Sequence, residues 1–220
     1  AHPMIEETVD DLARQGIKNI VALVLAPHFS SYSIGQYVGR AQTAAEPHDI
    51  SVVGINSWAT EPAFIDFLAT DMAAKKAALP ARTRVLFTAH SLPQRIIDGG
   101  DPYPQELHAT ATAVANKLGL VEGDDWAIAW QSAGRTPEPW IGPDILDVID
   151  TIAANKQADG VLVSACGFVA DHLEVLYDLD IEAKHRSDHH GLQFDRTTCV
   201  NDDAVVMAAL AQRVITAAQS

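Results

Sequence analysis

The stretch RVLFTAHSLP (residues 84–93) decides the fold of this chain, because an apolar run passes directly into a histidine and a proline-containing turn. An apolar run without polar alternation is typical of a strand that is buried on both faces of a parallel sheet. Similar runs occur at residues 19–26, 50–55, 126–131 and 160–165. Helical periodicity separates them, which predicts an α/β fold with open, mostly parallel sheets and helices on both sides.

The helical patterns lie between these runs and at both ends of the chain. Beyond an amphipathic helix at the start, they cover residues 33–46, 61–78, 104–118, 144–155 and 202–218. The alternation breaks at ALPARTR (78–84), where a proline and basic residues follow an Ala-rich helix. We therefore expect two domains, residues 1–79 and residues 80–220. Two strands are too few for a free-standing parallel sheet, and the chain opens inside a helix, so we expect the first domain to be the C-terminal part of a longer one.

Composition and charge are those of a globular protein with an acidic surface. Of 220 residues, 48% are hydrophobic, and 29 acidic residues stand against 15 basic ones. The negative field disfavours nucleic acid as a partner and favours cations. The apolar runs are far shorter than the ~20 residues of a membrane helix. Two cysteines are too few for a disulfide framework or an iron–sulfur cluster, so we expect a reducing cytoplasm and no cluster. We also expect a monomer with no tightly bound cofactor.

Polar segments follow four of the five predicted strands. They are residues 27–33, 90–93, 131–143 and 166–174. Ligands of open α/β sheets bind beyond the carboxyl ends of the strands. We expect these four segments to converge on one cleft.

His90 occupies an active-site position, since it directly follows a buried strand and precedes a turn. A neutral imidazole there can ligate a divalent metal or accept a proton near neutral pH. The alternative is a histidine that caps a helix or bonds a backbone carbonyl. The residue alone leaves both interpretations open.

A second candidate is the segment DHLEVLYDLDIE, which carries four carboxylates at spacings of three, four and four. Asp171, Glu174, Asp178 and Glu182 would share one face of a helix, with Glu174 and Glu182 ~12 Å apart at a rise of 1.5 Å per residue. Such a ladder of oxygen ligands suits cations, although a solvated acidic face is a fair alternative. The apolar residues 167–169 just before it favour a Glu174 close to the interior, where a carboxylate suits proton or metal exchange.

Several motifs together resemble those of ferrochelatases. TAHSLP (88–93), GDPYPQEL (100–107), WQSAGRTPEPWIGPD (130–144) and GFVADHLEVLYDLDIE (167–182) occur in that family's order and approximate spacing. APHFSSYSIGQYVGRA (26–41) looks like the porphyrin-side loop of the family's first domain. The resemblance covers essentially the whole chain. It implies two similar Rossmann-like domains of the class II chelatase type, the first incomplete here, with a porphyrin cleft between them.

The resemblance also implies a reaction, the insertion of ferrous iron into a porphyrin with loss of two protons, in haem biosynthesis. Carried over by motif, His90 is the metal ligand or proton acceptor, and Glu174 is its partner carboxylate across the cleft. Asp178 and Glu182 continue as metal ligands that accept or deliver the ion. The first-domain loop and the compact tail look like the Gram-positive bacterial forms, which use coproporphyrin III in place of protoporphyrin IX.

The porphyrin needs an apolar slot and partners for its carboxylates. We expect the substrate-binding residues to be Phe29, Ser30, Ser31, Tyr32, Ile34, Arg40 and Trp140. The aromatic and aliphatic members would form the slot, the serines would hydrogen-bond substrate carboxylates, and Arg40 would be a counter-charge. Ordinary packing and turn chemistry are the alternatives.

Some features depart from the family or point elsewhere. The family commonly has a proline shortly before GFV, where this chain has Ala165 and Cys166. We do not expect Cys166 to be catalytic. We interpret the histidines of HRSDHHG (185–191) as part of a solvated loop. Two other functions remain open, a cobalt or nickel chelatase of a corrin-type tetrapyrrole and a non-catalytic tetrapyrrole- or metal-binding module.

Overall fold

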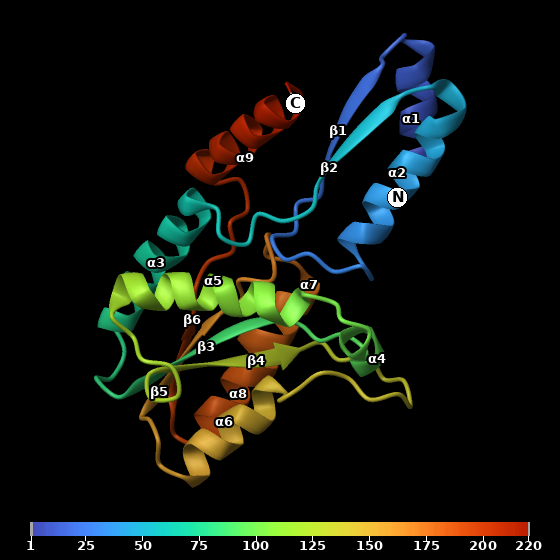
Figure 1. The fold of residues 1–220 in the computed structure, drawn as a ribbon. Helices are drawn as coiled ribbons and strands as arrows, with labels where there is room; N and C mark the ends of the chain where they lie inside the picture. The colour runs from blue at the N-terminus through green and yellow to red at the C-terminus, as the bar shows by residue number, and fades with distance from the viewer. Residues whose placement is uncertain (1, 220) are drawn as a thin grey trace.

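A computed structural model describes residues 2–219 of the chain. Its fold consists of two parallel sheets with helices around them (Figure 1). In chain order the strands are β1 (Asn19–Leu23), β2 (Ser51–Ile55), β3 (Thr83–His90), β4 (Trp126–Gln131), β5 (Gly160–Ser164) and β6 (Gln193–Arg196). β1 pairs with β2, and the other four follow the order β4-β3-β5-β6. Every pairing is parallel, so the predicted α/β class with parallel sheets is confirmed.

Helices connect the strands at nearly all of the predicted places. They are α1 (Ile5–Arg14), α2 (Ile34–Ala45), the 3-10 turn η1 (Glu46–His48), α3 (Pro62–Ala77), α4 (Gln94–Asp98), α5 (Tyr103–Leu118), α6 (Ile145–Ala154), α7 (Leu173–Val175), the π-helix η2 (Leu176–Ala183), α8 (Lys184–His189) and α9 (Ala204–Ala217). The prediction of a loop at residues 185–191 is wrong, although most of these residues are exposed as expected. Most of it is α8, which continues η2, buries Ser187 and carries an ion pair between Lys184 and Asp188 four residues apart.

Strand β3 lies inside the larger sheet and is covered on both faces. Val85 and Phe87 face a cluster that includes residues of α3, α5 and α9, such as Phe64. Leu86 faces the opposite cluster, which includes Ile149 of α6 and Leu179 of η2. The absence of polar alternation in this strand therefore has the predicted cause, burial on both faces.

Helix α3 belongs to the core of the larger sheet, although it precedes the boundary that the sequence suggests. Phe64, Leu68 and Met72 share a cluster with Val85 and Phe87 of β3. Helix α9 returns from the last strand and runs past α3 toward β1 and β2 (Figure 1). The division into residues 1–79 and 80–220 stays a prediction.

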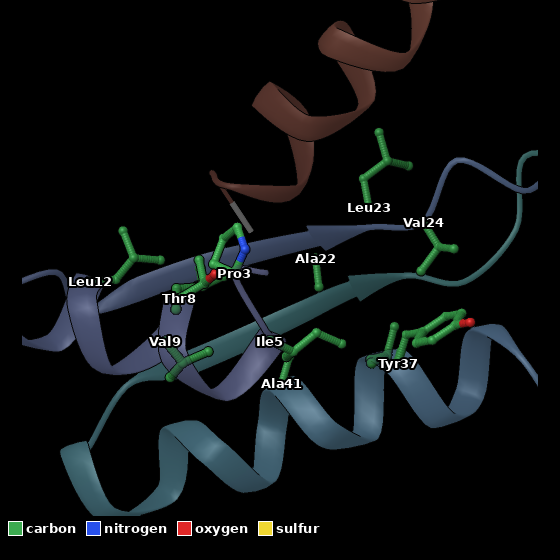
Figure 2. Close-up of a pocket in the computed structure, with 12 residues that line it drawn as sticks. Pro3, Ile5, Thr8, Val9, Leu12, Ala22, Leu23, Val24, Tyr37 and Ala41 are labelled. Carbon is green, nitrogen blue, oxygen red and sulfur yellow. The ribbon is translucent and has the colours of Figure 1, made fainter. Parts of the chain in front are cut away.

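The smaller sheet is covered by α1 and α2, and an apolar hollow of about 250 Å³ lies among these elements (Figure 2). Val9 of α1 packs with Ala45 and Ile50 beside it. Gly54 of β2 permits the close approach of α2, because a Cβ there would lie 2.6 Å from Val38. None of the predicted site residues lines this hollow.

The register of the larger sheet sets up the site. His90 ends β3 opposite Gln131, the last residue of β4, and Phe87 lies opposite Ser164, the last residue of β5. The segments that follow these strands leave from one edge, as Figure 1 shows for β3 and β4. None of the helices in the described part of the chain is long and apolar enough to cross a membrane.

Candidate functional site

The structure brings His90 and Glu174 together. The Nε2 atom of His90 lies 3.9 Å from Oε2 of Glu174, and both side chains are partly exposed. Nδ1 of His90 lies 2.5 Å from the carbonyl oxygen of Ser91. Because a carbonyl can only accept, Nδ1 donates, and a neutral ring then carries its free lone pair on Nε2. Two electron-pair donors thus face each other at a spacing that is too long for a direct hydrogen bond and that a cation between them can bridge.

Aromatic side chains flank this pair. The ring of Trp140 lies 6.3 Å from the His90 ring, and that of Phe168 lies 6.5 Å from it. Trp140 lies against Gly134, where a Cβ would come within 2.2 Å of the indole, and it donates to Thr136 Oγ1 at 2.8 Å. Trp140, which the sequence predicts as a slot residue, thus lies beside His90, and so does Phe168, which was not named as one.

Gly167 allows the backbone next to Phe168 to pass close to the end of β3, where His90 lies. A Cβ at Gly167 would lie 2.3 Å from the Cβ of Ala89, and the Gly167 amide donates to the Thr88 carbonyl at 3.0 Å. The segment after β5 therefore crosses directly over the end of β3. Burial raises the pKa of the neighbouring Cys166 thiol to about 12, which fits the expectation that this cysteine is not a nucleophile.

Asp178 lies in the π-helix and is held by the end of β4. It accepts a hydrogen bond from Ser132 Oγ, and Nε2 of Gln131 lies 3.5 Å from it. Ser132 has a left-handed backbone with φ of 58°, which is uncommon for a residue other than glycine. Thr88 fixes the amide of Gln131 with a hydrogen bond of 2.9 Å. A network that starts in β3 thus orients Asp178, the third carboxylate of the predicted ladder.

Glu182 lines the same small cavity as Asp178. The cavity has a volume of about 290 Å³, and Arg135 and Asp144 also border it. Burial raises the pKa of Asp144. The estimate of ~12 Å between Glu174 and Glu182 assumed an α-helix and does not apply, because the chain is π-helical from Leu176 to Ala183.

The four carboxylates of this segment do not form a single cage. Asp171 pairs with Arg196 at 2.8 Å and accepts from Asn201 at 2.9 Å, so it belongs to a structural network. Within residues 2–219, no three His, Cys, Asp or Glu side chains gather closely enough to hold a metal ion together. The arrangement is instead a facing pair, His90 and Glu174, followed by carboxylates farther along the helix.

The loop after β1 is fixed by two carboxylates that the sequence analysis did not single out, Asp101 and Glu106. Ser31 donates to Asp101 from its amide at 2.7 Å and from its hydroxyl at 2.6 Å, and Ser30 Oγ lies 3.1 Å from the same carboxylate. Glu106 accepts from the Phe29 amide at 2.6 Å. The two serine hydroxyls, predicted to bind substrate carboxylates, are therefore occupied by Asp101 in this structure.

Of the remaining residues that the sequence predicts to bind the substrate, Tyr32 is accessible, whereas Ile34 is buried and Arg40 is held in an ion pair. Tyr32 is exposed and has the guanidinium carbon of Arg95 5.7 Å from its ring centroid. Ile34 is fully buried, and it therefore has no surface to offer a substrate in this structure. Arg40 forms a two-pronged ion pair with Glu6 of α1, with both hydrogen bonds at 2.8 Å. The counter-charge expected at Arg40 is thus engaged by α1.

His28 belongs to the loop after β1 and is buried in the protein, so it is a structural residue and not part of the exposed site. The side chain is buried, its Nε2 bonds Thr110 Oγ1 at 2.8 Å, and burial lowers its pKa to about 3. It is neutral at physiological pH and has no exposed face toward the site.

Known proteins resemble this chain along nearly its whole length. A family model described as ferrochelatase matches residues 1–218. A ferrochelatase of Herpetosiphon aurantiacus is 44% identical over 92% of this chain and 67% of its own length. Coproporphyrin III ferrochelatases of Geobacillus kaustophilus and Oceanobacillus iheyensis are each 40% identical, over 97% and 100% of this chain and 68% and 70% of their own.

Solved structures agree on the fold. SirB from Bacillus subtilis with Fe3+ superposes with a TM-score of 0.68 over 99% of this chain and 79% of its own, at 14% identity. At that identity the likeness concerns the fold alone, and it confirms the expected Rossmann-like chelatase architecture. The sequence similarities confirm the resemblance that the motifs indicate.

Proposed function

The chain belongs to the ferrochelatase family of metal chelatases, and on this premise we propose that it inserts ferrous iron into a porphyrin with release of two protons. The family acts in haem biosynthesis. The observation that carries the proposal is the pair of His90 and Glu174, whose Nε2 and Oε2 atoms face each other at 3.9 Å at the carboxyl end of β3.

The chemistry of the reaction needs a base, a weakly held metal and a slot for the ring. In each half of the exchange, a pyrrole N–H bond breaks and its proton passes to a base, so two protons leave as one Fe(II) enters. Nε2 of His90 and the Glu174 carboxylate are the groups that we assign to these transfers. Trp140 and Phe168, which flank His90, would hold the flat macrocycle against them.

We propose that Asp178 and Glu182 bind the incoming Fe(II) ion first and transfer it to His90 and Glu174. Carboxylate oxygens and one imidazole bind Fe(II) without the strong retention that thiolates would cause. The placement of both carboxylates around one cavity supports a path along the π-helix. Ferrous iron is a substrate on this path and not a resident cofactor.

We infer that the porphyrin is coproporphyrin III in preference to protoporphyrin IX. The support is the names of the relatives from Geobacillus kaustophilus and Oceanobacillus iheyensis. A cobalt or nickel chelatase of a corrin-type tetrapyrrole, or a non-catalytic binding module, is not favoured, because relatives at 40–44% identity are ferrochelatases. We further propose a monomer that works in the reducing cytoplasm with both cysteines as free thiols.

The test is an anaerobic assay of the purified protein with ferrous iron and metal-free coproporphyrin III. We expect the fluorescence of the free porphyrin to decay at a rate that depends on protein concentration, and to decay more slowly with protoporphyrin IX. Fluorescence that stays constant with both porphyrins would refute iron insertion. Faster decay with protoporphyrin IX would refute only the preference for coproporphyrin III.

A further inference from the structure

We propose that Arg95 pairs with a peripheral carboxylate of the substrate and is a specificity-determining residue of this site. The inference rests on the proposed function, since it takes a carboxylated porphyrin as the ligand. It concerns the rim of the site, where the sequence analysis expected Arg40 to supply the positive charge.

Three segments meet at Arg95. Its guanidinium carbon lies 5.7 Å from the ring centroid of Tyr32, which comes from the loop after β1. Its Nε donates to Oε2 of Glu138 at 2.9 Å, and Glu138 comes from the segment after β4. Arg95 itself lies in α4, in the segment after β3. The guanidinium therefore has a defined position between the smaller sheet's loop and the two loops beside His90.

Arg95 also belongs to the same rim as His90. Pro93 bridges to Trp140, and the Gln94 amide donates to the Pro139 carbonyl at 2.8 Å. Trp140 in turn lies 6.3 Å from the His90 ring. A flat ligand that reacts at its centre above His90 would carry its carboxylates outward toward this rim.

The chemistry of the side chain suits such a contact. Guanidinium presents paired N–H donors that match a carboxylate, and here the aromatic ring and one bond from Nε hold it in place. The ion pair with Glu138 is largely exposed, with side chains 59% and 35% accessible, so it is weak enough for a substrate carboxylate to share the cation. With a formal net charge of −14 the protein repels a polyanionic ligand, and a fixed cation at the rim would offset that repulsion locally.

The other candidate cations near the site are placed less well. Arg40 donates from Nε and from Nη2 to the two carboxylate oxygens of Glu6. Arg135 borders the cavity that Asp144, Asp178 and Glu182 also line, away from the loop after β1. Arg95 is the cation that faces an exposed aromatic ring of the loop assigned to the porphyrin side.

The experiment measures binding of metal-free coproporphyrin III by fluorescence, together with KM and kcat for iron insertion. Arg95→Ala should weaken porphyrin binding and raise KM about tenfold, the loss expected for one charged hydrogen-bonding contact, with kcat unchanged within about twofold. Arg95→Lys should recover only part of the affinity, because it lacks the paired donors. Affinity for the wild type should also fall with added salt more steeply than affinity for Arg95→Ala.

Arg82→Ala is the matched control. Arg82 is similarly exposed, at 57%, and likewise pairs with one carboxylate, Asp159, but it precedes β3 at the end opposite His90. It should bind the porphyrin as the wild type does. Arg95→Gln, which keeps most of the side-chain stem over Tyr32, replaces Arg95→Ala if the latter unfolds.

Two outcomes would overturn the assignment. The first is an Arg95 variant that is folded and has wild-type affinity and KM. The second is an Arg82→Ala loss as large as that of Arg95→Ala, which would show a general charge effect. A wild type that binds coproporphyrin III without inserting iron would instead refute the proposed function, and the binding comparison would still decide the role of Arg95.

Discussion

Replacing Asp101 with alanine should release the loop after β1 from the body of the protein. Asp101 is buried, at 6% exposure, and accepts hydrogen bonds from Ser30 Oγ, from the amide and hydroxyl of Ser31, and from the Tyr103 amide. The bonds from Ser30 and Ser31 connect segments about 70 positions apart in the sequence. Loss of the carboxylate therefore disconnects the loop that carries Phe29 and Tyr32.

The loss of unfolding free energy in Asp101→Ala depends on which hydrogen-bond donors stay buried after the carboxylate is removed. Ser31 is exposed, so water can replace the carboxylate there. Ser30 and Tyr103 are buried, at 0% and 7%, and each donor left without a partner costs about 1–3 kcal/mol. Because the variant also avoids the cost of burying a charge, we expect a loss of about 2–4 kcal/mol of unfolding free energy.

Urea denaturation followed by tryptophan fluorescence measures this loss. With a slope of about 2 kcal/mol per molar urea, the midpoint should fall by about 1–2 M. Asp98→Ala is the control, because Asp98 lies on the exposed side of α4 and bonds only Gln94 among the described hydrogen bonds. Its unfolding free energy should stay within about 0.5 kcal/mol of the wild-type value. Equal midpoints for Asp101→Ala and the wild type would refute the reasoning.

Three further predictions concern buried groups. His28 has its pKa lowered to about 3 by burial, below the unfolded value of about 6.5, so the unfolded state binds more protons between these pH values and stability falls as pH falls through that window. His28→Gln keeps a donor for Thr110, and its loss of unfolding free energy between pH 6.5 and 4.5 should be smaller by about 2 kcal/mol; an equal loss would contradict burial of a neutral His28. Burial raises the pKa of both Cys166 and Cys199 to about 12, so a thiol reagent at pH 8 should modify neither cysteine in the native protein and both in urea, and rapid native modification would disprove this. Gly167→Ala should cost about 1–3 kcal/mol and slow iron insertion, because its Cβ would lie 2.3 Å from that of Ala89; wild-type stability and rate would rule out the close approach.

The sequence predicts the helices and strands that are long enough to show a continuous apolar run or a clear hydrophobic period. Strands β3 and β5 are continuous apolar runs because both of their faces are buried, and that cause is visible in the residues themselves. Strand β6 has four residues, of which only Phe194 is apolar, and α4 has five, so neither has enough length to show a period. The π-helix also escapes prediction, since a four-residue spacing of carboxylates is equally expected of an α-helix.

The candidate site also has parts that the sequence could predict and parts that it could not. His90 is the last residue of β3 and Glu174 lies in the segment after β5 of the same parallel sheet, so the carboxyl-edge rule is enough to bring them together. The partners of Ser30, Ser31 and Arg40 come from distant segments, and no local pattern identifies them. Asp101 and Glu106 lie in GDPYPQEL, a motif that the sequence analysis used only for its resemblance to the family.

The most direct test of the account is a double-mutant cycle on iron insertion with His90→Ala, Glu174→Gln and the double variant. If the two side chains act as one unit, each single change should lower kcat by about 100-fold or more, and the double variant should be no worse than the poorer single variant within about threefold. Single effects that multiply in the double variant, or either single variant with near wild-type kcat, would contradict the assignment of His90 and Glu174 as the catalytic pair.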